Sequence, residues 1–356
     1  MDWNRLAESA CAGAELSRKD AFDILNCPDD SLLSLLDAAF TVRRKYFGKR
    51  VKLNFLLNAK SGLCPEDCFY CAQSKVSTAG IDKYPFLSEE EILSAASRAV
   101  SVKARRFCMV NSGRGPTDGE IGRISSAVRK VRQEYPGLEI CVCLGLLRAE
   151  QAKELKACGV HAYNHNLNAS ENYYSSICGT HTYKDRVETV ETVKQSGLSS
   201  CSGCLFGMGE KDADILDLAF TMRKTGVDSI PLNFLIPIEG TPLESMAGLT
   251  PQKCLKILCL FRFLNPRSEI RIAGGRELHL RWLQPLGLYA ANSIFIGDYL
   301  TTKGQKPEAD LAMIRDLGFE IEGDPSLGRD GQVPSLAAKP SEDAPSPHEF
   351  SVQLRK

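Results

Sequence analysis

The sequence predicts an α/β fold, a complete (β/α)8 TIM-type barrel with an N-terminal helical extension and a flexible C-terminal tail. Apolar segments suited to strands alternate with amphipathic segments suited to helices, which is typical of parallel βα units. The length of 356 residues is normal for such a barrel with extensions. An open, doubly wound sheet remains the alternative, because it is built from the same alternation.

Three segments follow from this pattern. Residues 1–47 form the helical extension, since Asp30 precedes an apolar face that includes Leu32, Leu35 and Leu36. Residues 48–323 form the barrel, and residues 324–356, with prolines among Ser, Gly, Asp and Lys, form the tail. The expected strands are Val51–Leu57, Arg106–Asn111, Glu139–Leu144, His161–Asn166, Ser199–Phe206, Ser229–Leu235, Glu269–Ala273 and Asn292–Ile296. The expected helices are Ser88–Val102, Asp118–Glu134, Ala149–Ala157, Tyr183–Gln195, Asp212–Lys224, Pro251–Phe263 and Glu277–Leu288.

Composition excludes several classes of protein. The formal net charge of zero argues against a nucleic-acid binder, and no apolar run is long enough for a membrane span. The first residues do not have the pattern of a secretory signal, so we expect a cytoplasmic protein. In a reducing compartment, fourteen cysteines indicate metal ligands where they cluster and small buried side chains where they do not. The packing class is expected to include most of Cys11, Cys27, Cys158, Cys178, Cys254 and Cys259.

The strongest motif is Cys64-Pro-Glu-Asp-Cys68-Phe-Tyr-Cys71, directly after the first strand. A loop with this spacing can bind three irons of a 4Fe–4S cluster and leave the fourth open. A structural zinc site is the alternative, but such sites usually have four protein ligands and no fourth Cys or His lies nearby. The motif resembles that of the radical S-adenosylmethionine superfamily. The resemblance implies that the open iron binds S-adenosylmethionine, that a 5′-deoxyadenosyl radical forms, and that Tyr70 lies near the adenine.

Further motifs resemble those of the biotin synthase family within that superfamily. They include Arg106-Phe-Cys108-Met, Cys141-Val-Cys143-Leu-Gly, Tyr163-Asn-His-Asn-Leu-Asn168, Cys201-Ser-Gly and Ile270-Arg271-Ile-Ala-Gly-Gly, and the likeness covers about residues 3–322. The resemblance implies sulfur insertion into dethiobiotin to form biotin. It also implies a 2Fe–2S cluster as the sulfur donor, and the matching ligand positions are Cys108, Cys141, Cys201 and Arg271.

The residues themselves agree with this ligand set. All four positions fall in expected strands, and alternate strand residues point into a barrel. A buried Arg271 needs an anionic partner, which a sulfide-rich cluster would be. Isolated cysteines are often simply buried, so packing is the alternative. Cys143 shares a face with Cys141, so it could approach the cluster, but we expect it to fill the next layer. Cys204 faces away from Cys201, and we expect it to pack.

The family resemblance also implies roles for polar side chains. Asn166 and Asn233 would contact the substrate ring and Asn168 the ribose, where some relatives carry Asp. Arg186 would pair with the carboxylate of S-adenosylmethionine, for which a guanidinium is well suited, and Ser112 would lie near its amine. An ordinary surface arginine and a simple turn are the respective alternatives.

Two other functions and several partners complete the expectations. Another radical S-adenosylmethionine barrel enzyme, such as a maturase or mutase, would not need the second ligand set. An iron–sulfur carrier would not need a barrel lined with asparagines. The resemblance implies a small electron-donor protein of the flavodoxin or ferredoxin type, iron–sulfur assembly proteins and a homodimer.

Overall fold

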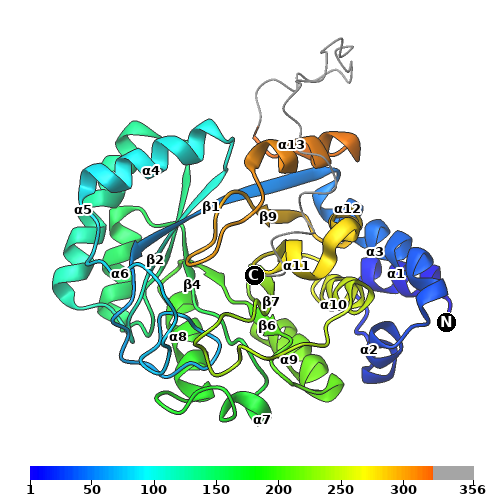
Figure 1. The fold of residues 1–356 in the computed structure, drawn as a ribbon. Coiled ribbons are helices and arrows are strands. Elements are labelled where there is room, and N and C mark those ends of the chain that lie inside the picture. Colours follow the sequence, from blue (N-terminus) through cyan, green and yellow to red (C-terminus); the bar gives the residue numbers. More distant parts are fainter. Residues whose placement is uncertain (324–356) are drawn as a thin grey trace, which may run out of the picture. The chain divides into compact units, whose positions relative to one another are not determined.

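The computed structural model describes residues 1–323, which form a closed barrel of parallel strands surrounded by helices (Figure 1). The predicted tail, 324–356, lies outside the described residues. In the hydrogen-bonded order each strand is parallel to its neighbours, and the last pairing joins β1 to β9 and closes the ring. The strands are β1 (Arg50–Lys60), β2 (Arg106–Asn111), β3 (Glu139–Cys143), β4 (Ala162–Asn164), β5 (Ser199–Cys201), β6 (Cys204–Phe206), β7 (Ser229–Phe234), β8 (Glu269–Ile272), β9 (Ser293–Phe295) and β10 (Glu320–Ile321).

The β1–β9 pairing confirms the predicted barrel and rules out the open sheet. Lys52, Leu53 and Asn54 of β1 pair with Ser293, Ile294 and Phe295 of β9. Since β5 and β6 occupy one position in the ring, the closed barrel has eight strand positions, and β10 adds only a short pairing to the start of β1.

Helices follow the strands around the outside of the barrel (Figure 1). Several begin with a capping box, in which a Ser or Thr side chain and an acidic side chain three residues later satisfy exposed backbone N–H groups. Ser88 with Glu91 and Thr117 with Glu120 are examples. The helices are α4 (Glu89–Ser101), α5 (Asp118–Glu134), α6 (Ala149–Cys158), α7 (Glu171–Tyr174), α8 (Tyr183–Gln195), α9 (Asp212–Thr225), α10 (Pro251–Leu264), α11 (Arg276–Leu280), α12 (Gln284–Ala290) and α13 (Pro307–Asp316), with 3-10 turns η1 (Asp29–Ser31) and η2 (Arg281–Leu283).

The first three helices pack beside the barrel. They are α1 (Trp3–Ala12), α2 (Arg18–Leu25) and α3 (Leu32–Phe47), and they contact α10 and α12 (Figure 1). Arg43 of α3 is fully buried, and its guanidinium donates to the carbonyls of Ala291 and Arg50, each at 2.9 Å. These bonds attach α3 to the ends of two barrel segments. No helix within residues 1–323 is long and apolar enough to cross a membrane.

Two expected elements are interrupted. The single strand predicted over Ser199–Phe206 is two short strands separated by Ser202 and Gly203. A side chain on Gly203 would lie 2.3 Å from the Pro231 carbonyl oxygen. The glycine therefore lets the backbone pass close to β7 between the two strands. The helix predicted over Glu277–Leu288 is likewise broken at Arg281, whose φ of 52° is incompatible with a continuous helix.

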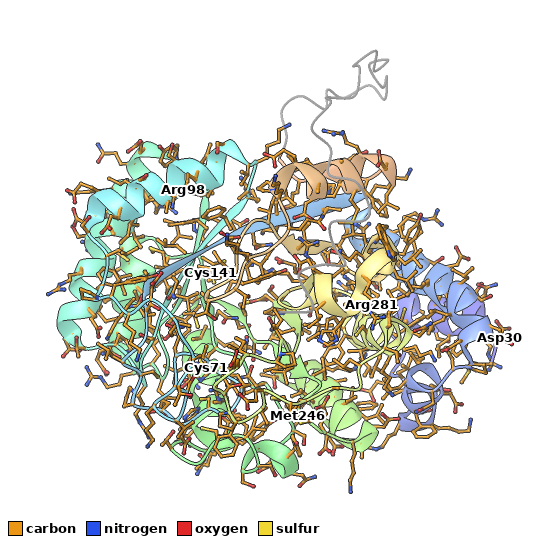
Figure 2. The ribbon with its side chains drawn as sticks, viewed as in Figure 1. Asp30, Cys71, Arg98, Cys141, Met246 and Arg281 are labelled. Atoms are coloured by element: carbon orange, nitrogen blue, oxygen red, sulfur yellow. The ribbon has the colours of Figure 1, made fainter. Side chains whose placement is uncertain are left out.

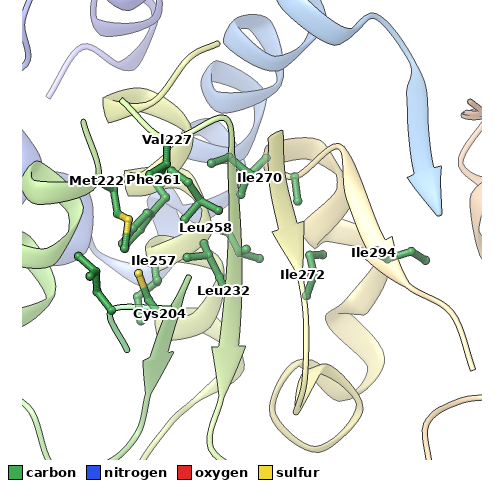
Figure 3. Close-up of a cluster of buried hydrophobic side chains, with 14 of the residues drawn as sticks. Cys204, Met222, Val227, Leu232, Ile257, Leu258, Phe261, Ile270, Ile272 and Ile294 are labelled. Carbon is green, nitrogen blue, oxygen red and sulfur yellow. The ribbon is translucent and has the colours of Figure 1, made fainter. Parts of the chain in front are cut away.

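The outer core lies between the strands and helices α9 and α10. Figure 3 shows Leu232 and Ile270 from the strands packed against Leu258 and Phe261 of α10. Cys204 belongs to the same cluster and is fully buried, so it packs outside the barrel interior.

Truncation of this core should destabilise the protein. Leu258 is fully buried, so Leu258→Ala leaves a cavity and should lower the free energy of unfolding by about 2–5 kcal/mol. Leu33→Ala is the matched control, since Leu33 is also in a helix but is 67% exposed. This substitution should change the free energy of unfolding by less than about 0.5 kcal/mol. Urea unfolding of the full chain measures both, and equal losses would contradict the packing described.

Candidate active site

Side chains at alternate strand positions form layers inside the barrel. Strand pairing places Arg106 beside Glu139 in one layer and Cys108 beside Cys141 in the next. Glu269 and Arg271 belong to the corresponding layers on β8, because residues two apart on a strand share a face. The interior therefore has a charged layer followed by a layer that contains sulfur, and layered filling is usual in parallel barrels.

The charged layer is a buried ion-pair network. Glu269 Oε2 lies 3.3 Å from Arg106 Nη1 and 3.8 Å from Lys52 Nζ, while Glu139 Oε2 lies 2.6 Å from Lys52 Nζ and 3.0 Å from Arg106 Nη2. Burial opposes ionisation of Glu269, but Arg106, Arg271 and Lys52 outweigh it and hold the pKa of its carboxyl well below the ordinary 4.5. Lys52 and Arg106 therefore balance the two carboxylates, and the positive charge of Arg271 in the next layer is left over.

The next layer brings together the predicted second ligand set. Cys108, Cys141, Cys201 and Arg271 are 4%, 1%, 1% and 1% exposed. Arg271 Nη1 lies 3.8 Å from Cys201 Sγ, and Asn164 Nδ2 donates to the same sulfur at 3.2 Å. A hydrogen bond from Cys141 lowers the pKa of Cys201 to about 5, although burial opposes this shift. The positive charges of Arg271 and Arg106 lower the pKa further. The layer therefore favours a thiolate.

Arg271 is fixed on three sides. Its Nε donates to Glu269 Oε1 at 3.1 Å, and its Nη2 also contacts that oxygen. The hydroxyls of Ser229 and Ser293 accept from the guanidinium at 3.0 and 3.3 Å. Nη1 points toward the cysteines, because its hydrogen-bond partner among residues 1–323 is Cys201 Sγ.

A cavity of about 290 Å³ lies above the sulfur layer. Its lining includes both predicted groups: Cys108, Cys141 and Arg271 below, and Tyr70 and Cys71 from the loop after β1. Figure 2 labels Cys141 and Cys71, which come from segments far apart in the sequence. One cavity therefore joins the two cysteine motifs.

Asparagines line the same cavity. The side-chain oxygen of Asn166 accepts from Gly203 N at 2.9 Å and from Asn164 Nδ2 at 3.0 Å, while its own amide nitrogen has no protein acceptor within residues 1–323. Asn233 is held at both ends, by Cys204 O and Gly274 N, each at 3.0 Å. Asn168 donates to Tyr70 Oη at 2.5 Å. Asn166 therefore offers a fixed, unused donor to a ligand.

Asn168 lines the cavity although it lies beyond the end of strand β4. Strand β4 ends at Asn164, and Asn168 has a left-handed φ of 66°. A short polar side chain tolerates this conformation better than most. The three asparagines thus meet through a bend of the backbone after β4, while all three line the cavity.

Backbone hydrogen bonds fix the loop that carries Cys64, Cys68 and Cys71. Cys71 N donates to Cys68 O at 3.1 Å, Phe69 N to Ile177 O at 3.0 Å, and Lys75 N to Glu66 O at 2.9 Å. Cys68 is buried, and Cys64 and Cys71 are half-buried. Three thiols on one fixed loop next to the cavity are a donor set that fits an iron–sulfur cluster with one open iron.

Two predicted cosubstrate residues do not line this cavity. Arg186 is buried, 8% exposed, and donates to Asn166 O at 2.6 Å and to His181 Nε2 at 2.8 Å. It is therefore not an ordinary surface arginine. Ser112 is buried and its hydroxyl donates to Gly62 O at 2.6 Å. Contact of either with S-adenosylmethionine stays a prediction.

Sequence reasoning missed two groups of residues. Arg106 and Glu269 lie two residues before Cys108 and Arg271, so strand parity could have placed them inside the barrel. Cys178 was expected to pack, but its sulfur lies 3.8 Å from Cys68 Sγ and 3.3 Å from His181 Nδ1. The Cys178-Gly-Thr-His181 spacing was the available signal.

Known proteins resemble this chain in sequence and in fold. The profile of the radical SAM superfamily matches residues 60–222, and that of the biotin and thiamin synthesis associated domain matches residues 231–320. Biotin synthase of Lysinibacillus sphaericus is 55% identical over 90% of this chain and 97% of its own length. Biotin synthase of Anoxybacillus flavithermus is 53% identical over 92% and 99%. Methylornithine synthase shares the fold, with a TM-score of 0.78 and 22% identity over 89% of this chain and 97% of its own.

The barrel, the cysteine loop at the end of β1 and the first profile define a radical S-adenosylmethionine enzyme. Such an enzyme uses S-adenosylmethionine and a 4Fe–4S cluster. Within that class, the chain belongs to the biotin synthase family, whose members also use a 2Fe–2S cluster. It is a sulfurtransferase that forms biotin from dethiobiotin, and a maturase or mutase activity is not favoured.

The buried network gives a stability prediction. Glu269→Gln leaves Arg271 and Arg106 without their shared anion and should lower the free energy of unfolding at pH 7 by about 3–5 kcal/mol. Because the pKa of Glu269 is lower in the folded chain than its ordinary 4.5, this stabilisation is present above about pH 4.5. The difference from wild type should therefore shrink as the pH falls further.

Glu120→Gln is the matched control. Glu120 pairs with Lys60 at 2.8 Å near the surface. Loss of this ion pair should lower the free energy of unfolding by no more than about 1 kcal/mol. Denaturant unfolding between pH 3 and 7 measures both variants. A Glu269→Gln variant as stable as Glu120→Gln would contradict the network.

Proposed function

We propose that Cys64, Cys68 and Cys71 hold the 4Fe–4S cluster, and that Cys108, Cys141, Cys201 and Arg271 hold the 2Fe–2S cluster. One observation carries the proposal: three buried thiols and a guanidinium from four strands share a layer, and Cys108, Cys141 and Arg271 of that layer line the same cavity as Cys71. The positive charge of Arg271, left over when Lys52 and Arg106 balance Glu139 and Glu269, supports an anionic group in this layer.

When bound, the 4Fe–4S cluster and S-adenosylmethionine supply the 5′-deoxyadenosyl radical, and the 2Fe–2S cluster supplies the sulfur. The chain's own residues orient and enclose the reactants. Phe295 and Leu56 line the cavity together with the strands, so they help to keep water from a reactive carbon. Arg271, fixed by Glu269, keeps one guanidinium nitrogen directed at the sulfur layer.

The polar lining suits the substrate and cosubstrate. We assign the ureido ring of dethiobiotin to Asn166 and Asn233, supported by the unused amide donor of Asn166 and the fixed orientation of Asn233. S-adenosylmethionine is assigned to Tyr70 and Asn168, supported by their contact beside Cys71, together with Asn166, Ser112 and Arg186. An amide at position 168 can bind a ribose hydroxyl without the extra strength of a charge.

Partners and location follow from the chemistry. An enzyme that needs single electrons requires a small donor protein of the flavodoxin or ferredoxin type, and its clusters require iron–sulfur assembly proteins. A cytoplasmic location is supported by the fourteen cysteines, all of which are free. We also propose a homodimer, and a division of the chain into an extension (1–47), a barrel (48–323) and a tail (324–356).

The test separates the two ligand sets. The anaerobically reconstituted full chain, with dethiobiotin, S-adenosylmethionine and a reductant, should yield biotin and 5′-deoxyadenosine by mass spectrometry. Cys64→Ala should lose both products. Cys141→Ala should lose biotin but keep cleavage of S-adenosylmethionine, because the radical is generated without the second set.

Cys259→Ala is the control, since Cys259 is buried among apolar residues of α10 and should leave both products. Biotin formation by Cys141→Ala at the wild-type level would overturn the second ligand set. Formation of 5′-deoxyadenosine by Cys64→Ala at the wild-type level would overturn the first.

A further inference from the structure

Two carboxylates of the cysteine loop after β1 fix the segment between α7 and α8. Asp67 Oδ1 accepts from Thr180 N at 3.0 Å, and Glu66 Oε2 accepts from Thr180 Oγ1 at 2.6 Å. Glu66 Oε2 also lies 2.5 Å from Nδ1 of His181, whose side chain is buried at 7% exposure. One ring nitrogen of this histidine is therefore held by the loop of residues 64–71.

The other ring nitrogen of His181 faces the guanidinium of Arg186. His181 Nε2 lies 2.8 Å from Arg186 Nη2 and 3.1 Å from Arg186 Nε. Because an arginine can only donate hydrogen bonds, Nε2 carries a lone pair and the ring proton lies on Nδ1. Nδ1 then donates to Glu66, so the imidazole is uncharged and its orientation is fixed from both sides.

Arg186 extends this arrangement to the wall of the cavity. Its Nη1 donates to the backbone carbonyl of Asn166 at 2.6 Å, and Asn166 lines the cavity. The guanidinium also contacts the hydroxyl of Tyr174, and its central carbon lies 5.6 Å from the centroid of that ring. A continuous chain of hydrogen bonds therefore runs from the carboxylate of Glu66 to Asn166, whose side chain is assigned to the substrate ring.

Arg186 does not donate to a carboxylate within residues 1–323. Its hydrogen-bond acceptors there are the imidazole of His181, the hydroxyl of Tyr174 and a backbone carbonyl. A buried cation is stable when an anion pairs with it, so this guanidinium favours an anionic ligand. A carboxylate in the place of His181 would pair with the guanidinium and compete with that ligand. An uncharged imidazole instead orients the arginine and leaves its charge available.

We propose that His181 is a positioning residue for S-adenosylmethionine, which acts through Arg186. With Nδ1 held by Glu66, its Nε2 fixes the guanidinium so that Arg186 supports Asn166 and keeps its charge for the carboxylate of the cosubstrate. The inference rests on the proposed function, which assigns that carboxylate to Arg186, and deepens it by naming the residue that orients this arginine.

Two substitutions separate the two hydrogen bonds of the imidazole. In His181→Gln the amide oxygen can accept from Arg186 where Nε2 does, whereas in His181→Asn the shorter amide can reach Glu66 but not Arg186. His161→Asn is the matched control, since His161 Nε2 also lies 3.2 Å from an arginine, Arg132, but His161 directly precedes β4 and does not line the cavity.

The affinity of the chain loaded with its 4Fe–4S cluster for S-adenosylmethionine is the first measurement. It is read from the change that the cosubstrate causes in the electron paramagnetic resonance spectrum of the reduced cluster, at equal iron content per chain and without dethiobiotin. Loss of a hydrogen bond to a charged group in His181→Asn should weaken binding about tenfold, whereas His181→Gln and His161→Asn should stay within about threefold of wild type.

The ratio of products is the second measurement. His181→Asn should form more 5′-deoxyadenosine per biotin than wild type, because Arg186 no longer fixes Asn166, and His181→Gln should restore the ratio. Wild-type affinity and ratio in His181→Asn would overturn the proposal, as would equal losses in His181→Gln and His181→Asn. A wild-type chain that forms no biotin would contradict the proposed function instead, and the affinities would still decide the role of His181.

The position of the ring proton is a test that does not depend on the variants loading a cluster. The full chain has five histidines, and ¹⁵N labelling of their rings shows by nuclear magnetic resonance which nitrogen carries the proton. The signals that disappear in His181→Gln belong to His181. A proton on Nδ1 is expected; a proton on Nε2 would overturn the proposal, because that nitrogen could then not accept from Arg186.

Discussion

The contact between the Glu269 carboxylate and the Arg271 guanidinium fixes the cationic side chain that faces the cysteines of the sulfur layer. Arginine has a long, flexible side chain, and here two serines and one carboxylate hold it in a single orientation. The same carboxylate faces Arg106 and Lys52, so it also balances the layer beneath. Without this anion, the cations Arg106, Lys52 and Arg271 would outnumber the remaining carboxylate, Glu139, in the barrel interior. The position of Arg271, and with it the environment of Cys201, depends on Glu269.

The layers give each part of the interior its own chemistry. Charges near the start of the strands set the local field, sulfur and guanidinium occupy the middle, and amides surround the open cavity above. The cysteine loop after β1 reaches the same cavity through Tyr70 and Cys71. A closed barrel can hold these groups together because strands far apart in sequence converge on one axis.

Much of the architecture could be predicted from the sequence, because it follows from local patterns. Alternating apolar segments gave the barrel, and the cysteine spacing after the first strand gave the class of enzyme. The close approach of Gly203 to Pro231 could not be predicted, because Pro231 lies on another strand. The contact of Cys178 with Cys68 is equally invisible, because it joins loops 110 residues apart. The bend that brings Asn168 to the cavity depends on the left-handed backbone conformation of Asn168 itself. The alternation of side chains along a strand does not predict such a conformation.

The most direct test of the central claim is an anaerobic crystal structure of the chain loaded with both clusters, S-adenosylmethionine and dethiobiotin. Our account predicts that Arg271 binds the second cluster together with Cys108, Cys141 and Cys201 while Glu269 still contacts its guanidinium. It also predicts dethiobiotin between that cluster and S-adenosylmethionine. A second cluster bound through Cys143 instead, with Arg271 turned away, would contradict the role given to the Glu269–Arg271 contact.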